Sequence, residues 1–147
     1  MKQSTLIFAA ALGVFTTLTP SLLQAQNTKM VVSNIKSNQG QIVLSVFKDD
    51  TAYENEQPFK TLAFEKTGLA NGTMTLSFTL EPGTYGITLI DDKNKNGKID
   101  KNMLGIPKEG FGFSNFFMDK MKKPLFDEFK VKINAKENTV TAKIKYM

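Results

Sequence analysis

The sequence predicts an all-β fold: a seven-stranded antiparallel β-sandwich, immunoglobulin-like or prealbumin-like, with one long loop. Three observations lead to this prediction. From Lys29 onward, apolar and polar residues alternate in short runs, which is the pattern of half-buried strands. Turn signals such as Asn38-Gln39-Gly40 and Glu81-Pro82-Gly83 separate the runs. No segment carries a convincing amphipathic helix, and many short strands without helices are typical of two packed sheets.

The predicted strands follow one another along residues 30–146. Apolar residues occupy both faces of the second, which indicates a central strand, whereas the fourth alternates cleanly between apolar and hydroxyl-bearing residues. A polar loop, 49–60, separates the second from the third. The predicted strands are 30–36, 41–48, 61–66, 73–80, 84–90, 126–134 and 139–146.

The first 25 residues have the features of an export signal. Lys2 is the only charge before Lys29, an apolar run covers residues 6–14, and Leu23-Gln24-Ala25 ends on a small residue suited to cleavage. The apolar run is too short to span a bilayer convincingly. We therefore expect a signal peptide at 1–25 and one mature domain at 26–147, periplasmic or secreted, with no stable membrane insertion once the signal is removed.

Histidine, cysteine, arginine and tryptophan are missing, and the absence of the first three excludes several function classes. The chain has no histidine and no cysteine, so Ser-His-Asp and Cys-His catalysis and disulfide bonds are excluded. The formal net charge is +5, yet every basic residue is a lysine. Without arginine for bidentate contacts to phosphates and guanines, we expect no nucleic-acid partner. An exported chain without cysteine is more typical of bacteria than of eukaryotes.

The stretch from Asp91 to Asp100 has the spacing of a calcium loop. Calcium takes about six to eight oxygen ligands, and a glycine at the sixth place lets a short segment wrap the ion. In the register that starts at Asp92, Gly97 takes that place. The predicted ligands are the side chains of Asp92, Asn94 and Asn96, the backbone carbonyl of Lys98, and Asp100 directly or through water.

The match to a helix–loop–helix calcium site is incomplete. The twelfth place, where a bidentate glutamate is expected, is Met103, and two lysines lie inside the loop. Any site would borrow an acid from outside, with Asp91 and Glu109 as the nearest candidates. The alternative is a polar hairpin turn without an ion, because Asn96-Gly97 is a favoured two-residue turn.

Glycine and phenylalanine alternate after the acidic stretch. Phe111, Phe113 and Phe116 could form an aromatic face for a glycan, peptide or lipid. They could equally pin the long loop onto the domain as a small second core. We favour the second interpretation, because apolar clusters under long loops are common satellites of a main core.

Several of these stretches together resemble one bacterial family. They are Glu81-Pro82-Gly83-Thr84-Tyr85, the loop from Asp91 to Asp100, the run from Leu104 to Asn115, and Pro124-Leu125-Phe126-Asp127. The mature chain is similar over nearly its whole length to the domain of unknown function 2141 family. The resemblance implies an exported β-sandwich-like domain and brings no established activity. Family members often carry histidine where this chain has Asp91, so no role of that histidine is transferred.

Three functional hypotheses follow. The first is a non-catalytic exported domain whose calcium-ordered loop presents a surface to an extracellular or periplasmic protein or glycan. The second is a carboxylate-dependent hydrolase acting on an extracellular substrate, since paired carboxylates can cleave glycosides. The third is a purely structural or adhesive domain without a bound ion. The acids available to a hydrolase are Asp91, Asp92, Asp100, Glu109 and Asp127.

Overall fold

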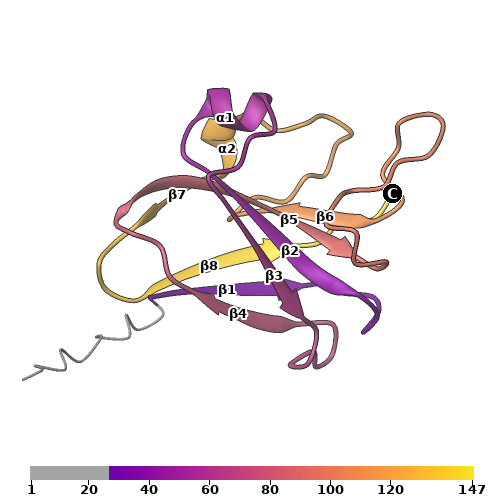
Figure 1. The fold of residues 1–147 in the computed structure, drawn as a ribbon, viewed down its shortest axis with the longest axis horizontal. Helices are drawn as coiled ribbons and strands as arrows, with labels where there is room; N and C mark the ends of the chain where they lie inside the picture. Colours follow the sequence, from indigo (N-terminus) through magenta and orange to yellow (C-terminus); the bar gives the residue numbers. More distant parts are fainter. Residues whose placement is uncertain (1–26) are drawn as a thin grey trace, which may run out of the picture.

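The computed structural model describes residues 27–147, and these form two β-sheets that face each other across an apolar core (Figure 1). The predicted signal peptide, residues 1–25, lies outside the described residues. The three-stranded sheet has the order β4-β1-β8. Its strands are β1 (Thr28–Ser33), β4 (Met74–Phe78) and β8 (Asn138–Lys143).

The second sheet has five strands in the order β3-β2-β5-β6, with β7 paired to the first half of β5. The chain reaches β5 after a turn at Pro82, and β5 is the longest strand of the described residues. It pairs with three neighbours, so it is the spine of this sheet. The strands are β2 (Gln41–Phe47), β3 (Lys60–Glu65), β5 (Gly83–Asp92), β6 (Gly110–Phe113) and β7 (Lys130–Ile133).

Three details of the predicted fold are corrected. Residues 27–147 contain eight strands rather than seven, and the extra one, β6, lies inside the predicted long loop. Strands β1 and β8 pair in parallel, so the sandwich is not purely antiparallel. The predicted strand 126–134 begins with a helical turn, α2 (Phe126–Phe129), and only β7 is extended. Alternation along one strand carries no information on its neighbours, which is why the pairing direction was not predictable.

The helical turns are short and each has a local cause. Helix α1 (Asp50–Glu54) lies in the predicted polar loop, and the carboxylate of Asp49 caps it by accepting a hydrogen bond from the Ala52 N–H at 2.8 Å. In α2 the Glu128 carboxylate accepts the N–H of Leu125 at 2.7 Å. No helix in residues 27–147 is long and apolar enough to cross a membrane.

Two apolar clusters hold these elements together. The main core lies between the sheets and contains fully buried residues of both, including Met30 and Val32 from β1 and Ile87 and Leu89 from β5. The second cluster covers the outer face of the five-stranded sheet beneath α1 and α2. Its buried members are Phe47, Tyr53, Phe111, Phe113, Met118, Phe126 and Phe129.

Candidate functional site: the loop after strand β5

The loop that follows β5, residues 93–109, begins where the strand delivers two adjacent carboxylates to opposite faces of its sheet. Successive side chains of a strand point to opposite sides. Asp91 therefore shares the inner side with Ile87 and Leu89, whereas Asp92, the last residue of β5, lies on the other face next to the loop. Both aspartates are fully buried, with 0 % of their surface exposed. Strand β5 thus places one carboxylate, Asp91, in the core and a second carboxylate, Asp92, beside the loop.

The Asp92 carboxylate organises the first half of the loop. Its Oδ1 accepts the N–H of Asn96 at 3.1 Å, and its Oδ2 accepts the N–H of Gly97 at 2.8 Å. Oδ2 also accepts the side-chain amide of Gln41, which lies opposite Asp92 on β2, at 2.8 Å. Gly97 has a φ of +74°, the left-handed conformation that the tight turn requires. The aspartate therefore bends the chain back over itself.

The next polar side chains along the loop gather around Asp100. The Asn94 amide donates to Oδ2 of Asp100 at 2.8 Å, and the Asn96 amide donates to both oxygens at 3.1 Å. The amide oxygens of the two asparagines accept backbone N–H groups, of Asn96 at 3.2 Å and of Lys98 at 2.9 Å. Three of the predicted ligand side chains thus contact one another, and the fourth, Asp92, is hydrogen-bonded to the backbone between them.

Glu109 closes the loop from its far end. One carboxylate oxygen accepts the N–H of Lys93 at 3.0 Å, and the other accepts the N–H of Asp100 at 3.1 Å. Because Lys93 opens the loop and Asp100 ends its acidic stretch, one buried side chain ties both together. Glu109, the predicted borrowed acid, is thus placed next to Lys93 and Asp100, and its carboxylate is hydrogen-bonded to their backbone. Lys98, whose backbone carbonyl is a predicted calcium ligand, lies in the loop between Asn96 and Asp100.

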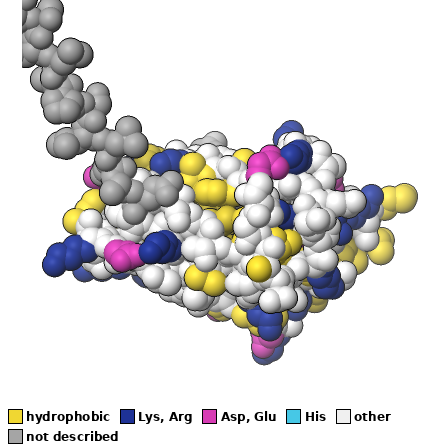
Figure 2. Space-filling view, turned by 90° about the horizontal axis from the view of Figure 1, so that it is seen from below, with side chains coloured by type: hydrophobic (Ala, Val, Ile, Leu, Met, Phe, Trp, Pro, Cys, Tyr) yellow, Lys and Arg dark blue, Asp and Glu magenta, His cyan; other side chains and the backbone are white. Residues whose placement is uncertain are grey.

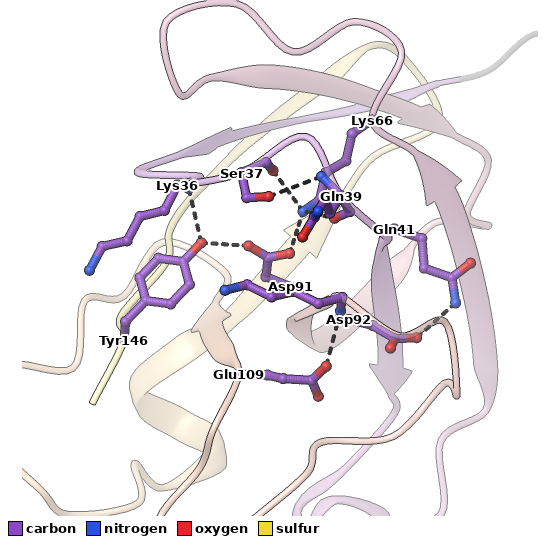
Figure 3. A network of polar contacts seen from close by, with 10 residues as sticks. Lys36, Ser37, Gln39, Gln41, Lys66, Asp91, Asp92, Glu109 and Tyr146 are labelled. Carbon is purple, nitrogen blue, oxygen red and sulfur yellow. Dashed lines mark hydrogen bonds and ion pairs between the residues drawn. The ribbon is translucent and has the colours of Figure 1, made fainter.

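Asp91 lies apart from these groups. Its carboxylate forms an ion pair with Lys66 and accepts the Tyr146 hydroxyl at 2.5 Å (Figure 3). The Lys66 ammonium also donates to the backbone carbonyls of Ser37 at 2.9 Å and Gln39 at 2.6 Å. Each of these charged side chains is at most 1 % exposed. The structure does not bring Asp91 to the other predicted ligands; it makes this residue the centre of a buried polar network.

The pKa of Tyr146 reflects its position in this buried network. Burial, and after it the hydrogen bond to Asp91, raises the pKa of Tyr146 well above its ordinary value of 10.0. The phenol therefore stays protonated and donates to the carboxylate.

Sequence reasoning missed Lys66 and its role. Strand alternation would have indicated it, because Lys66 comes two residues after Phe64 and four after Leu62, on the face that points to the core. A lysine on such a face is buried only when its charge has a partner.

The three predicted ligand-binding phenylalanines belong to the second core. Phe111 and Phe113 are each 8 % exposed and pack edge-to-face, with ring centroids 6.1 Å apart. Phe116 is half-buried against Phe113. Phe111 and Phe113 also line a groove of about 910 Å³ on the outer face of the five-stranded sheet, and residues 97–101 and 105–107 of the loop form part of its lining. The loop therefore forms part of the wall of this groove.

The loop's donor set is rich in asparagine and backbone oxygens rather than acids. Within the part of the chain that the structure describes, no group of three or more His, Cys, Asp or Glu side chains is arranged to hold a metal ion. A cation here would depend on amide and carbonyl oxygens together with the Asp100 carboxylate, because both oxygens of Asp92 already accept hydrogen bonds. Calcium accepts such neutral oxygen ligands readily.

Comparison with known proteins agrees with the family suggested by the motifs. A family model described as "Uncharacterized protein conserved in bacteria (DUF2141)" matches residues 30–141. The chain belongs to this family. The match runs from β1 to β8 and includes the whole loop after β5. No curated protein and no solved structure matches the chain.

Proposed function

We propose that this DUF2141 protein is an exported, non-catalytic binding domain whose loop after β5 is ordered by calcium. The observation that carries the proposal is the gathering of Asn94, Asn96 and Asp100 in a loop that Asp92 and Glu109 already bend closed. An ion bound there would be held by the Asp100 carboxylate and by amide oxygens turned inward. The loop lines the groove beside Phe111, so its order would fix the shape of a binding surface.

The Asp100 carboxylate supplies the negative charge that a cation would need at this position. Two amide N–H donors point at the Asp100 carboxylate. Turning both asparagine amides about their last bond would direct two oxygens at the same carboxylate. Three oxygen ligands facing one another are stable only with a cation between them. Calcium binding would therefore exchange hydrogen bonds inside the loop for ligand bonds, with Asp92 and Glu109 still holding the backbone.

The arrangement of the acids supports binding over hydrolysis. Asp91 is occupied by Lys66 and Tyr146, and Glu109 by two backbone N–H groups. Asp127 lies on α2 and pairs with Lys130. A glycoside hydrolase needs two carboxylates that face a substrate across a gap. The buried acids of this site instead face the protein's own donors.

Calcium titration of residues 26–147 is the direct test. Binding to the native state alone raises stability, by about 2.7 kcal/mol when calcium is a hundredfold above its dissociation constant. We expect heat on titration and a rise in melting temperature with calcium, and a smaller response to magnesium, which demands stricter octahedral geometry. Absence of both heat and a thermal shift at millimolar calcium would favour the ion-free structural or adhesive domain.

Two single-residue variants sharpen this test. Asp100→Asn removes the central carboxylate and should abolish the calcium response while leaving the fold intact, because Asp100 is only half-buried. Asp119→Asn makes the same charge change at an exposed position outside the loop and should respond like the parent. An Asp100→Asn protein that still responds fully to calcium would place the ion elsewhere. The Asp92→Asn variant separates the hydrolase: a stable fold that has lost turnover would support catalysis.

A further inference from the structure

The most exposed apolar side chains of residues 27–147 lie together at the tip of the loop after β5. Met103 is 103 % exposed and Leu104 is 83 % exposed. They are neighbours in a chain reversal, where polar residues are the rule. Isolated exposed apolar residues need no explanation, but two large ones side by side at the end of a projection expose a continuous apolar tip.

The backbone beneath this tip is firmly held. Residues 100–108 form a small hairpin in which the Lys108 N–H donates to the Asp100 carbonyl at 2.8 Å and the Asn102 N–H donates to the Ile106 carbonyl at 2.9 Å. The Asn102 side chain accepts the N–H groups of Leu104 at 2.9 Å and Ile106 at 3.0 Å. The two apolar side chains are therefore presented by a pre-formed turn, which reduces the entropy lost when they bind.

The flanks of the tip are positively charged. Five exposed lysines lie between residues 93 and 108, and of these Lys95 pairs with Glu65. The other four ammonium groups form no ion pair with any described residue. The loop's own acids are buried or held by the asparagine amides. The five are Lys93, Lys95, Lys98, Lys101 and Lys108.

We propose that this tip docks on an anionic lipid bilayer, with Met103 and Leu104 entering the boundary between headgroups and acyl chains and the lysines lying over the headgroups. The proposal rests on the proposed function in taking the loop as the binding surface, and it names the partner. The contact is peripheral and involves two side chains, not a membrane span. Figure 2 shows hydrophobic side chains projecting with lysines beside them at the end of the molecule where the loop lies in Figure 1.

The chemistry of the tip favours a lipid surface over a protein or glycan partner. A convex pair of aliphatic side chains is buried easily by a fluid phase, whereas a protein must offer a matching pocket. Protein-binding surfaces are enriched in aromatic residues, arginine and methionine and depleted in lysine, whereas the tip has one methionine, no aromatic residue and no arginine, and lysines flank it. Lysine is a flexible point charge, suited to mobile headgroups, and each one near an anionic surface adds to the attraction.

Vesicle co-sedimentation tests the proposal with residues 26–147. The probes are vesicles of phosphatidylcholine alone and of phosphatidylcholine mixed equally with phosphatidylglycerol, each with calcium and with a chelator. We expect binding to the anionic vesicles that weakens as salt is added. The double variant Met103→Ser/Leu104→Ser should bind about a hundredfold more weakly, since two buried aliphatic side chains are lost. Leu125→Ser, at an exposed aliphatic residue outside the loop and the groove, should bind like the parent.

A lysine pair tests the charge term separately. Lys101→Gln/Lys108→Gln should weaken binding about thirtyfold, whereas Lys132→Gln/Lys136→Gln, with the same charge change on and after β7, should have little effect. Equal losses in both pairs would reduce the interaction to net charge and overturn a docking tip. So would an absence of vesicle binding, or binding unchanged in the Met103→Ser/Leu104→Ser variant.

Failure of this inference and failure of the proposed function give different results. A calcium-dependent thermal shift without vesicle binding overturns lipid docking and leaves the calcium-ordered domain standing. Vesicle binding that is equal in calcium and chelator, without any thermal shift, supports the docking tip and overturns the calcium-ordered loop. Binding that strengthens with calcium and is lost in the tip variant supports both.

Discussion

The Lys66→Met substitution is the sharpest test of how the fold is held together. Lys66 lies between the sheets, where its ammonium contacts the Asp91 carboxylate and the carbonyls of Ser37 and Gln39. Methionine fills a similar volume but carries no charge and no donor. It would leave a buried carboxylate with only the Tyr146 hydroxyl as partner. Removing one member of a buried ion pair costs about 3–5 kcal/mol, because the remaining charge stays out of water.

That loss is large for a domain of this size. Single domains are stable by about 5–15 kcal/mol, so Lys66→Met should remove about a fifth or more of the total and lower the melting temperature by about 10–20 °C. Urea unfolding followed by far-ultraviolet circular dichroism measures the change directly. The chain has no tryptophan, so backbone dichroism is a better probe than fluorescence.

A double variant separates the ion pair from the space it occupies. Lys66→Met/Asp91→Leu removes both charges and should be more stable than Lys66→Met alone, because no unpaired charge remains buried. It should still be less stable than the parent, since the carbonyls of Ser37 and Gln39 lose a donor. The reasoning is refuted if Lys66→Met costs less than about 1 kcal/mol, the scale of an exposed pair, or if the double variant is the less stable of the two.

Two further predictions concern packing and pH. In Gly86→Ala the new Cβ would lie 2.7 Å from the Phe129 ring, so we expect a loss of about 1–3 kcal/mol in unfolding free energy. Gly68→Ala is the matched control: a Cβ there has no neighbouring atom within 4 Å, so this variant should unfold like the parent. The raised pKa of Tyr146 means that the unfolded chain loses this proton first, so stability is full below pH 10.0 and falls as the pH rises beyond it. Unfolding in urea at a series of alkaline pH values should show a shallower fall for Tyr146→Phe than for the parent, and an unchanged slope would contradict the assignment.

Strand alternation predicted most of what lies between the sheets. The apolar residues of the cleanly alternating fourth predicted strand, such as Met74 and Leu76, are buried. Val140 and Ile144, which alternate with polar residues in the last predicted strand, are buried as well. This worked because the period of two is a property of the extended backbone itself. The same rule, applied to Lys66 at the end of the third predicted strand and to Asp91 just past the fifth, also places both side chains inside, although it does not show that they meet.

The loop after β5 was also predictable only in part from the sequence. Its sequence contains the oxygen spacing, the glycine at the sixth place and the nearby Glu109, and the structure brings Asn94, Asn96 and Asp100 into contact. Two features could be seen only in the tertiary structure. Glu109 hydrogen-bonds to the backbone of Lys93 and of Asp100, and Asp91 points away from the loop and pairs with Lys66.

The sequence alone determined the local choices: extended segments, their inward and outward faces, the turns between them and a loop rich in oxygen ligands. These follow from side-chain sterics and periodicity, which act over a few residues. The tertiary structure decided which strands are neighbours, that β1 and β8 run in parallel, that Gly110–Phe113 is a strand and Phe126–Phe129 a helical turn. It also decided that Lys66 meets Asp91, 25 residues later in the chain. Those outcomes depend on burial against distant segments, whose free energy exists only once the sheets have packed.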